Sequence, residues 1–596
     1  MSTVSQHLQH IEASGLIRLA AIEPDLEYLF RHALVQDAAY ESLLRQDRKR
    51  LHLSVAETLD SLYPDHPDDL APMLASHFYL AGDSRALKYY LQAGDAAYSM
   101  YANREAVMHY THALEVAGWP VSAVTSEQLI HLCLQCGRAH QFASQLDEAI
   151  AFYQQITDLA RAQGDQSLEL TAQVEYVTIL CTFNSKSDFA KGKAIAHDML
   201  ALARQLGDRK TEAKILWALL LPTRFEGEPL AGISYGEQAL SIASELGLRE
   251  LMAYILNDMN MTYGSAGHIE KAMASVAEAR KLWRELGNLP MLADSLSGSV
   301  PHYYLVGKFD EALAFADEAY QISLSIDNLW GQAYSGLFSP KIYLDRGEFD
   351  VLFEVAKRSL KTGEKASFIA PAIYTRQMLA MTYCCLGAFE EGLAVIQQAD
   401  ELTRQLKLPW QSVGAAAFAQ LYILVGDLDQ AQYYVNEGYR FIAESYPDEF
   451  SPAVCWIPFA EAEICIAQRE YTRAVSILDT LEETRNVVAR LGESPLIPEG
   501  FYFRAKALIG LEQFEMARGI LQKAHDRALT LNFRRLLWQI LYTLSEVETK
   551  LGNLSEAARC RQQSREVLII MANHIGRTDL RKSFEGLPAV QVVLNS

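Results

Sequence analysis

The chain has 596 residues, of which 50% are hydrophobic and 21% charged, and its net charge is −21. One compact core does not extend over this length, so several domains or an elongated repeat array are expected. The acidic balance argues against general binding to nucleic acids or anionic membranes, because their phosphates would be repelled. Eight cysteines, a polar N-terminus and no apolar run of about 18 residues favour a reducing cytoplasm with no membrane span.

The first 50 residues predict a short helix followed by a β-hairpin. Residues 4–14 place apolar side chains on one helical stripe, and two apolar runs, 15–19 and 26–30, flank Glu23-Pro24-Asp25. A proline at the second position of such a segment is typical of a β-turn. This order corresponds to the second half of a winged helix without its first half. A start at this point leaves apolar residues of the helix without packing partners, which is a reason to expect a longer native polypeptide.

A sequence motif recurs every 40 residues in the centre of the chain, and we refer to it below as the phrase. Gly267, Gly307, Gly347 and Gly387 each open nearly the same sequence, which reads Gly-Lys-Phe-Asp-Glu-Ala at 307–312. Related phrases extend from residue 101 to residue 557, spaced 39 to 43 residues apart, and make about twelve units. A fixed period of this length is the signature of a solenoid.

Each unit predicts two helices. The glycine supplies a left-handed turn after the first helix, and the small residue that ends the phrase lets two helices approach closely. The predicted fold is all-α, an α-solenoid superhelix of about twelve helix pairs preceded by the partial winged helix with its one β-hairpin. The expected domains are 1–50 for the partial winged helix and junction helix, 51–98 for linking helices, 99–577 for the repeats and 578–596 for a C-terminal tail.

The phrase resembles the tetratricopeptide repeat, and its long period is similar to the repeats of maltose-regulator (MalT-like) transcription activators. The segment Phe30-Arg-His-Ala-Leu-Val-Gln-Asp-Ala-Ala-Tyr-Glu-Ser-Leu-Leu44 and the tail 579–589 resemble the repeat region of bacterial signal-transduction ATPases. Some of these carry a class III adenylate or guanylate cyclase domain. The resemblance implies an ATPase or cyclase module in cis in relatives, or in trans here. This sequence contains no Gly-x4-Gly-Lys-Ser/Thr phosphate loop, and the cyclase aspartates have no counterpart, so neither activity is implied for it.

Few residues suggest chemistry. Cys133, Cys136 and His140 share one helical face and could hold zinc or act in redox chemistry, but packing as small apolar side chains is the favoured interpretation. We therefore predict no catalytic, cofactor-binding or metal-binding residues, and no enzyme activity. The same packing interpretation applies to the pairs Cys384 with Cys385 and His109 with His112.

A short basic run in the N-terminal region, formed by Arg45, Arg48, Lys49 and Arg50, suggests DNA contact. The first 52 residues nevertheless hold six Lys or Arg and seven Asp or Glu. This balance is poor for phosphate binding, so we interpret the run as a solvated helix face or a contact with a partner module. DNA binding is not expected.

A candidate partner-binding strip follows from stepping by 40 residues along the first helices of consecutive pairs. It mixes aromatic, amide and charged side chains, a composition that suits recognition. The alternative is that these positions pack on the next repeat or are solvated. The strip comprises Tyr254, Asn257, Asp258, Met261, Asp294, Ser297, Tyr334, Lys341, Tyr374 and Gln377.

The sequence predicts a non-catalytic scaffold or sensor arm that binds a protein, a peptide or a small effector in signal transduction. Two alternatives stay open. One is the arm of a transcription regulator, which DNA retardation would distinguish. The other is a fragment of an adenylate cyclase or ATPase polypeptide, which nucleotide binding would distinguish.

Overall fold

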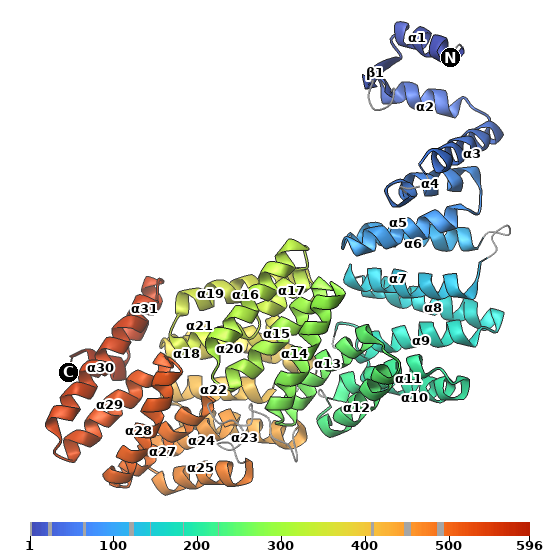
Figure 1. Cartoon of the computed structure of the whole chain (residues 1–596). Coiled ribbons are helices and arrows are strands. Elements are labelled where there is room, and N and C mark those ends of the chain that lie inside the picture. The colour runs from blue at the N-terminus through green and yellow to red at the C-terminus, as the bar shows by residue number, and fades with distance from the viewer. Residues whose placement is uncertain are drawn as a thin grey trace. The chain divides into compact units, whose positions relative to one another are not determined.

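The computed structural model describes residues 3–21, 27–63, 67–118, 124–143, 145–182, 184–223, 226–406, 411–445, 455–485 and 494–595. Across these segments the protein is helical apart from one two-stranded antiparallel sheet (Figure 1), as the repeat period predicts. The chain divides into two compact units, Met1–Glu175 and Tyr176–Ser596. Within the described segments, no helix combines the length and the apolar character that crossing a bilayer requires.

The first unit begins with the predicted helix and hairpin. Helix α1 (Thr3–Ala13) precedes strands β1 (Ile17–Ala21) and β2 (Glu27–Phe30), which pair antiparallel with Ile17 opposite Phe30. The predicted turn at residues 23–25 lies outside the described residues. The helices that follow in this unit are α2 (Ala33–Glu41), α3 (Arg45–Leu62), α4 (Pro67–Ala81), α5 (Ala86–Ser99), α6 (Asn103–Ala117), α7 (Ser126–Phe142), α8 (Leu146–Gln163) and most of α9 (Gln166–Cys181).

The second unit continues with helices of similar length. They are α10 (Phe189–Leu206), α11 (Arg209–Thr223), α12 (Pro229–Glu245), α13 (Arg249–Ser265), α14 (Ile269–Leu286), α15 (Leu289–Leu305), α16 (Phe309–Ser325), α17 (Leu329–Ser335), α18 (Ser339–Arg346), α19 (Phe349–Lys365), η1 (Pro371–Thr375), α20 (Arg376–Cys385), α21 (Phe389–Leu406), α22 (Gln411–Val425), α23 (Leu428–Ser445), α24 (Trp456–Ala467), α25 (Tyr471–Arg485), α27 (Leu496–Gly510), α28 (Phe514–Thr530), α29 (Arg534–Lys550), α30 (Leu554–Asn573), α31 (Thr578–Gly586) and α32 (Pro588–Asn595). Taken in order from α5 to α30, the described helices form twelve pairs, if α17 with α18 and η1 with α20 each count as one first helix.

The repeated glycine ends the first helix of a pair, as predicted. Gly307 has φ +75°, and the N–H of the next residue, Lys308, donates to the carbonyl of Tyr303 at 2.9 Å. This bond from the residue after a left-handed glycine back to the last helical turn is a Schellman cap. The same bond recurs after Gly267, Gly347 and Gly387, each time to a tyrosine carbonyl. Local backbone chemistry therefore explains the period.

Two adjacent first helices depart from regular geometry. Residues 336–338 interrupt the helix between α17 and α18, and Pro340 follows the interruption. In the next pair, a π-helical turn, η1, starts at Pro371 and continues directly into α20. Proline removes a backbone donor and crowds the preceding turn, and π-turns are frequent at functional sites. Both irregularities lie in the helices that carry the predicted strip.

The C-terminal helices fold back onto the middle of the second unit, where Figure 1 shows α29 to α31 close to α18. The N–H of Gly576 donates to the Asp350 carboxylate at 2.7 Å, and Ser583 Oγ donates to the carbonyl of Gly387 at 2.8 Å. Phe584 of α31 and Val593 of α32 are fully buried. The segment that we expected to be a tail is therefore part of the core of this unit.

Candidate functional site

The structure divides the predicted strip into half-buried and buried side chains. Helices α13, α15 and α17 carry most of the half-buried ones, which leaves part of the strip accessible. The half-buried residues are Tyr254, Asp258, Met261, Asp294, Tyr334 and Tyr374. The buried residues are Asn257, Ser297, Lys341 and Gln377.

Hydrogen bonds join equivalent positions of successive repeats along the accessible part. Trp217 Nε1 of α11 donates to the Asp258 carboxylate of α13 at 2.8 Å. Asn257 Nδ2 of α13 donates to the Asp294 carboxylate of α15 at 2.6 Å, and Ser295 Oγ donates to the Asn257 side-chain oxygen. These bonds fix the rotamers of the strip, so its exposed edges are pre-organised.

An aromatic cluster continues the strip at the irregular helices. Trp330, Tyr334, Phe338, Phe368 and Tyr374 are all half-buried, and neighbouring ring centroids lie 4.9 to 6.0 Å apart. Burial raises the pKa of the Tyr374 phenol, so the hydroxyl stays protonated. Rings at such spacings offer apolar contact area with little loss of side-chain entropy, a property of recognition surfaces.

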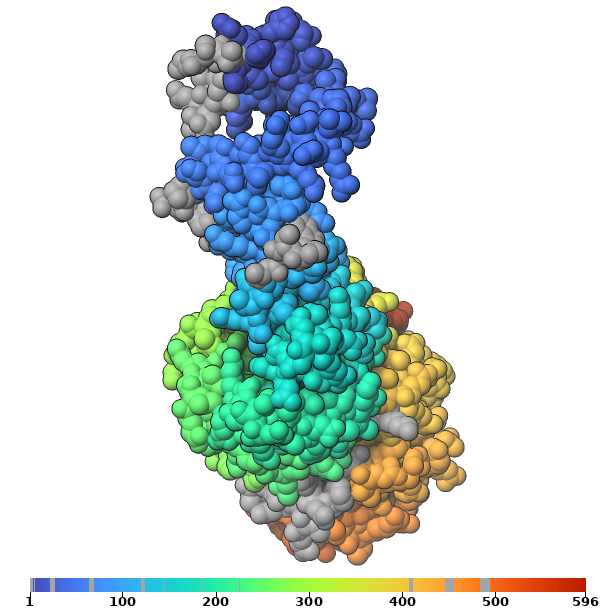
Figure 2. All heavy atoms as spheres, turned by 90° about the vertical axis from the view of Figure 1, so that its right-hand side faces the viewer, coloured from blue at the N-terminus to red at the C-terminus, as the bar shows by residue number. Residues whose placement is uncertain are grey.

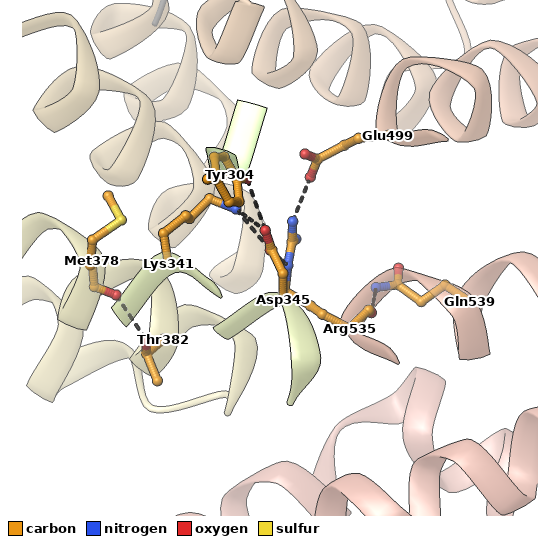
Figure 3. A network of polar contacts seen from close by, with 8 residues as sticks. All are labelled: Tyr304, Lys341, Asp345, Met378, Thr382, Glu499, Arg535 and Gln539. Atoms are coloured by element: carbon orange, nitrogen blue, oxygen red, sulfur yellow. Dashed lines mark hydrogen bonds and ion pairs between the residues drawn. The ribbon is translucent and has the colours of Figure 1, made fainter. Parts of the chain in front are cut away.

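An interior polar network is centred on α18, whose N-cap is Phe338 of this cluster (Figure 3). Asp345 is fully buried and accepts hydrogen bonds from Lys341 Nζ at 2.7 Å, from the Tyr304 hydroxyl at 2.9 Å and from Arg535 Nε at 3.0 Å. The other end of the Arg535 guanidinium pairs with Glu499 at 3.0 Å. The network joins α15, α18, α27 and α29, and the two partners of the Arg535–Asp345 bond are 190 residues apart in the sequence.

The formal charges of the interior polar network cancel, since Lys341 and Arg535 face Asp345 and Glu499. Burial lowers the pKa of Lys341, and Asp345 opposes that shift. Burial also acts to lower the pKa of Arg535, but Glu499 and Asp345 raise it overall. Buried charges persist only when paired and hydrogen-bonded in this way. Lys341 is therefore held inside the protein by Asp345 of the same helix, whose carboxylate is also bound by Arg535 of α29.

The cysteine and histidine candidates lie in packed surroundings. Cys133 and Cys136 are buried in α7, and burial raises the pKa of Cys136 to about 12, which keeps it a thiol. His140 pairs with the Gln145 side chain at 3.0 Å. The described residues contain no group of three or more His, Cys, Asp or Glu arranged to hold a metal ion. Burial also raises the pKa of Cys385 to about 11, and His109 is buried.

Neither a family model nor a curated protein matches the sequence. Among solved structures, the chain is similar to a Rap protein complexed with competence and sporulation factor, with 14% identity, a TM-score of 0.36 and coverage of 68% of this chain and 99% of that one. It is also similar to yeast Tom70, with 15% identity, a TM-score of 0.32 and coverage of 85% and 96%. For the Cut9–Hcn1 hetero-tetramer of the APC/C the values are 12%, 0.42, 94% and 98%.

Proposed function

We propose that the protein is a non-catalytic scaffold of tetratricopeptide-like helix pairs that holds an extended protein or peptide segment along the strip of α13, α15 and α17. The supporting observation is the row of half-buried aromatic and acidic side chains, from Tyr254 to Phe338, held by hydrogen bonds between successive repeats. Aromatic anchors with oriented polar neighbours are the elements that supply most of the affinity in binding surfaces.

The strip carries acidic groups at Asp258 and Asp294, and the whole chain has a net charge of −21. Charge complementarity favours a segment with basic side chains and apolar or aromatic anchors. Such a ligand would place its anchors against Tyr254 and Tyr334 and its basic groups near the two carboxylates.

The test uses a displayed library of random linear peptides selected on the full-length chain. We expect selected peptides to lose about tenfold or more in affinity for Tyr254→Ala and Tyr334→Ala, the loss typical of an aromatic contact residue. Tyr433→Ala is the matched control, because Tyr433 is 51% exposed on α23, the second helix of its pair. Failure to select any peptide, or equal affinity for all three variants, would contradict the proposal.

We further propose that this arm serves a bacterial signal-transduction ATPase or cyclase module, on the same polypeptide or on another, in a reducing cytoplasm. The sequences of residues 30–44 and 579–589 support this role by their resemblance to such proteins. The eight cysteines, none of which is in a disulfide, are consistent with a reducing compartment. Immunoprecipitation with an antibody against residues 580–595, followed by mass spectrometry, should recover a sequence with a Gly-x4-Gly-Lys-Ser/Thr loop. Recovery of this chain alone at 66.7 kDa would contradict the module assignment but not the binding strip.

A further inference from the structure

The N-terminal segment has almost no core of its own. Among the described residues up to 63, Ile17 and Ala56 are the only buried hydrophobic side chains. Twelve large hydrophobic side chains of the same segment are exposed, and Leu34 reaches 81%. Figure 2 shows this segment in the darkest blue, at the N-terminal end of the first unit. Soluble proteins rarely expose so many neighbouring apolar groups unless a partner covers them.

Helix α3 organises part of this exposed surface into one stripe. Leu51, Val55 and Leu62 are 48%, 40% and 64% exposed, and Leu44 at the N-cap is 74% exposed. Steps of four and seven residues return to nearly the same side of a helix, so these side chains line up. Another side of α3 is already occupied, since Ala56 is fully buried and His52 hydrogen-bonds His77 of α4 at 2.8 Å.

The spacing of the stripe is the same in both directions. Leu44, Leu51, Val55 and Leu62 are separated by seven, four and seven residues, symmetrically about residue 53. If a second copy of α3 packed antiparallel against the first, Leu44 of each copy would lie opposite Leu62 of the other, and Leu51 of each copy would lie opposite Val55 of the other. A two-fold axis makes an interface self-complementary in this way, whereas an unrelated partner would not require the symmetry.

The charge along α3 also favours an antiparallel copy. Residues 45–50 hold four basic side chains and one acidic one, whereas residues 51–62 hold Glu57 and Asp60 and no Lys or Arg. Basic groups at a helix N-terminus are unfavourable alone, but an antiparallel neighbour brings its acidic, C-terminal end beside them. Glu57 already pairs with Arg85 of the same chain at 2.9 Å, so it need not form an ion pair with the second copy. The overall distribution of charge along α3 is what favours the antiparallel orientation of the two helices.

The charge of the segment permits such a contact. Residues 1–63 hold six Lys or Arg and nine Asp or Glu, a net charge of −3. A net charge this small keeps like-charge repulsion between two paired copies low. We propose that the protein forms a homodimer in which the α3 helices of two copies pair antiparallel through Leu44, Leu51, Val55 and Leu62. This surface is separate from the peptide strip and does not depend on it.

Sedimentation of the full-length chain from about 1 to about 100 µM, where modest interfaces associate, tests the proposal. We expect the mass to rise from 66.7 kDa to about twice that value. Leu51→Glu with Val55→Glu should raise the dissociation constant at least about 100-fold, because carboxylates would be buried without partners. Val351→Glu with Leu554→Glu is the matched control, since these residues are 43% and 67% exposed on α19 and α30. Circular dichroism melts confirm that each variant is folded.

Disulfide cross-linking then tests the orientation. Tagged Leu44→Cys chains are mixed with untagged Leu62→Cys chains and oxidised, with the native chain as background control. Antiparallel pairing predicts mixed cross-links in excess over cross-links within either variant. A monomer at every concentration, dissociation by the control variant as well, or cross-links mainly between identical positions would each overturn the proposal. Dimers of unchanged strength in Leu51→Glu with Val55→Glu would do so too.

Discussion

Replacing Asp345 by asparagine should open the contact between the C-terminal helices and α18. Asp345 is fully buried, and it accepts hydrogen bonds from Tyr304, Lys341 and Arg535. Without its charge, Lys341 stays buried with no carboxylate within ion-pair distance, and one acidic group, Glu499, faces two cations. Removal of one partner from a buried ion pair costs about 3 to 5 kcal/mol. The loss should appear where the network joins distant elements.

Hydrogen exchange detected by mass spectrometry measures this loss locally, which suits a long repeat array, because such arrays need not unfold in one step. Protection of amides in α29 should fall by about 3 kcal/mol or more in Asp345→Asn. The control is Asp310→Asn, because the Asp310 carboxylate is 92% exposed and pairs with Arg346 at 2.5 Å. That surface pair should contribute less than about 1 kcal/mol.

A double variant separates charge from packing. Lys341→Met with Asp345→Leu removes a buried opposite pair and keeps Arg535 paired with Glu499. Replacement of a buried ion pair by apolar residues of similar volume is often neutral, but the Tyr304 hydroxyl and Arg535 Nε also lose their acceptor, so part of the protection should return. Our reasoning is refuted if Asp345→Asn changes α29 protection by less than about 1 kcal/mol, or if the double variant is as unstable as the single one.

Three further predictions rest on single residues. Burial lowers the pKa of His302 to about 4. Below pH 6.5 the unfolded chain then binds more protons than the folded one, so about 3 kcal/mol of the free energy of unfolding should be lost between pH 6.5 and pH 4. The His302→Gln variant should keep this stability. Equal loss of stability with acid in the native chain and in the variant would contradict the prediction. In urea unfolding, Gly347→Ala should lower the free energy of unfolding more than Gly207→Ala does. Both glycines have φ near +70°, so the backbone strain is the same, but a Cβ at Gly347 would lie 2.6 Å from Met571, whereas one at Gly207 meets nothing within 4 Å. Cys136 should resist iodoacetamide at pH 8 in the native chain, since its pKa is raised to about 12 by burial, and rapid alkylation would show that the site is open.

The repeat units were predictable because they depend on local chemistry. The glycine at 307 and its equivalents define the end of each first helix, and the left-handed φ values confirm the turns. The N-terminal helix and hairpin follow equally from short patterns of apolar residues and a turn. Interactions within a few residues of one another are enough to determine these elements.

The packing of the C-terminal helices against α18, which closes the second unit, was not predictable in the same way. Lys341 and Asp345 are four residues apart, so their pairing could be inferred from the sequence, but Arg535 and Glu499 come from helices far along the chain. Helical periodicity indicates which face of a helix is apolar. It does not indicate the angle by which each helix pair is rotated relative to the preceding one. A small rotation per pair, accumulated over many pairs, decides which first helices meet. The break before Pro340 and the π-turn at Pro371 add local changes that the period does not contain.

The closure also decides which residues of the strip can report on binding. Asn257 and Lys341 are 5% exposed and hold their neighbours through hydrogen bonds, so alanine at either position would lower stability whether or not a partner binds. Tyr254 and Tyr334 keep exposed edges and make ring contacts, so their truncation removes recognition area at smaller structural cost. Loss of affinity in Tyr254→Ala or Tyr334→Ala, with α29 protection unchanged, would therefore locate the ligand on α13 and α17. If peptide affinity and α29 protection were both lost, these tyrosines would affect binding only by stabilising the fold and not by contacting the ligand.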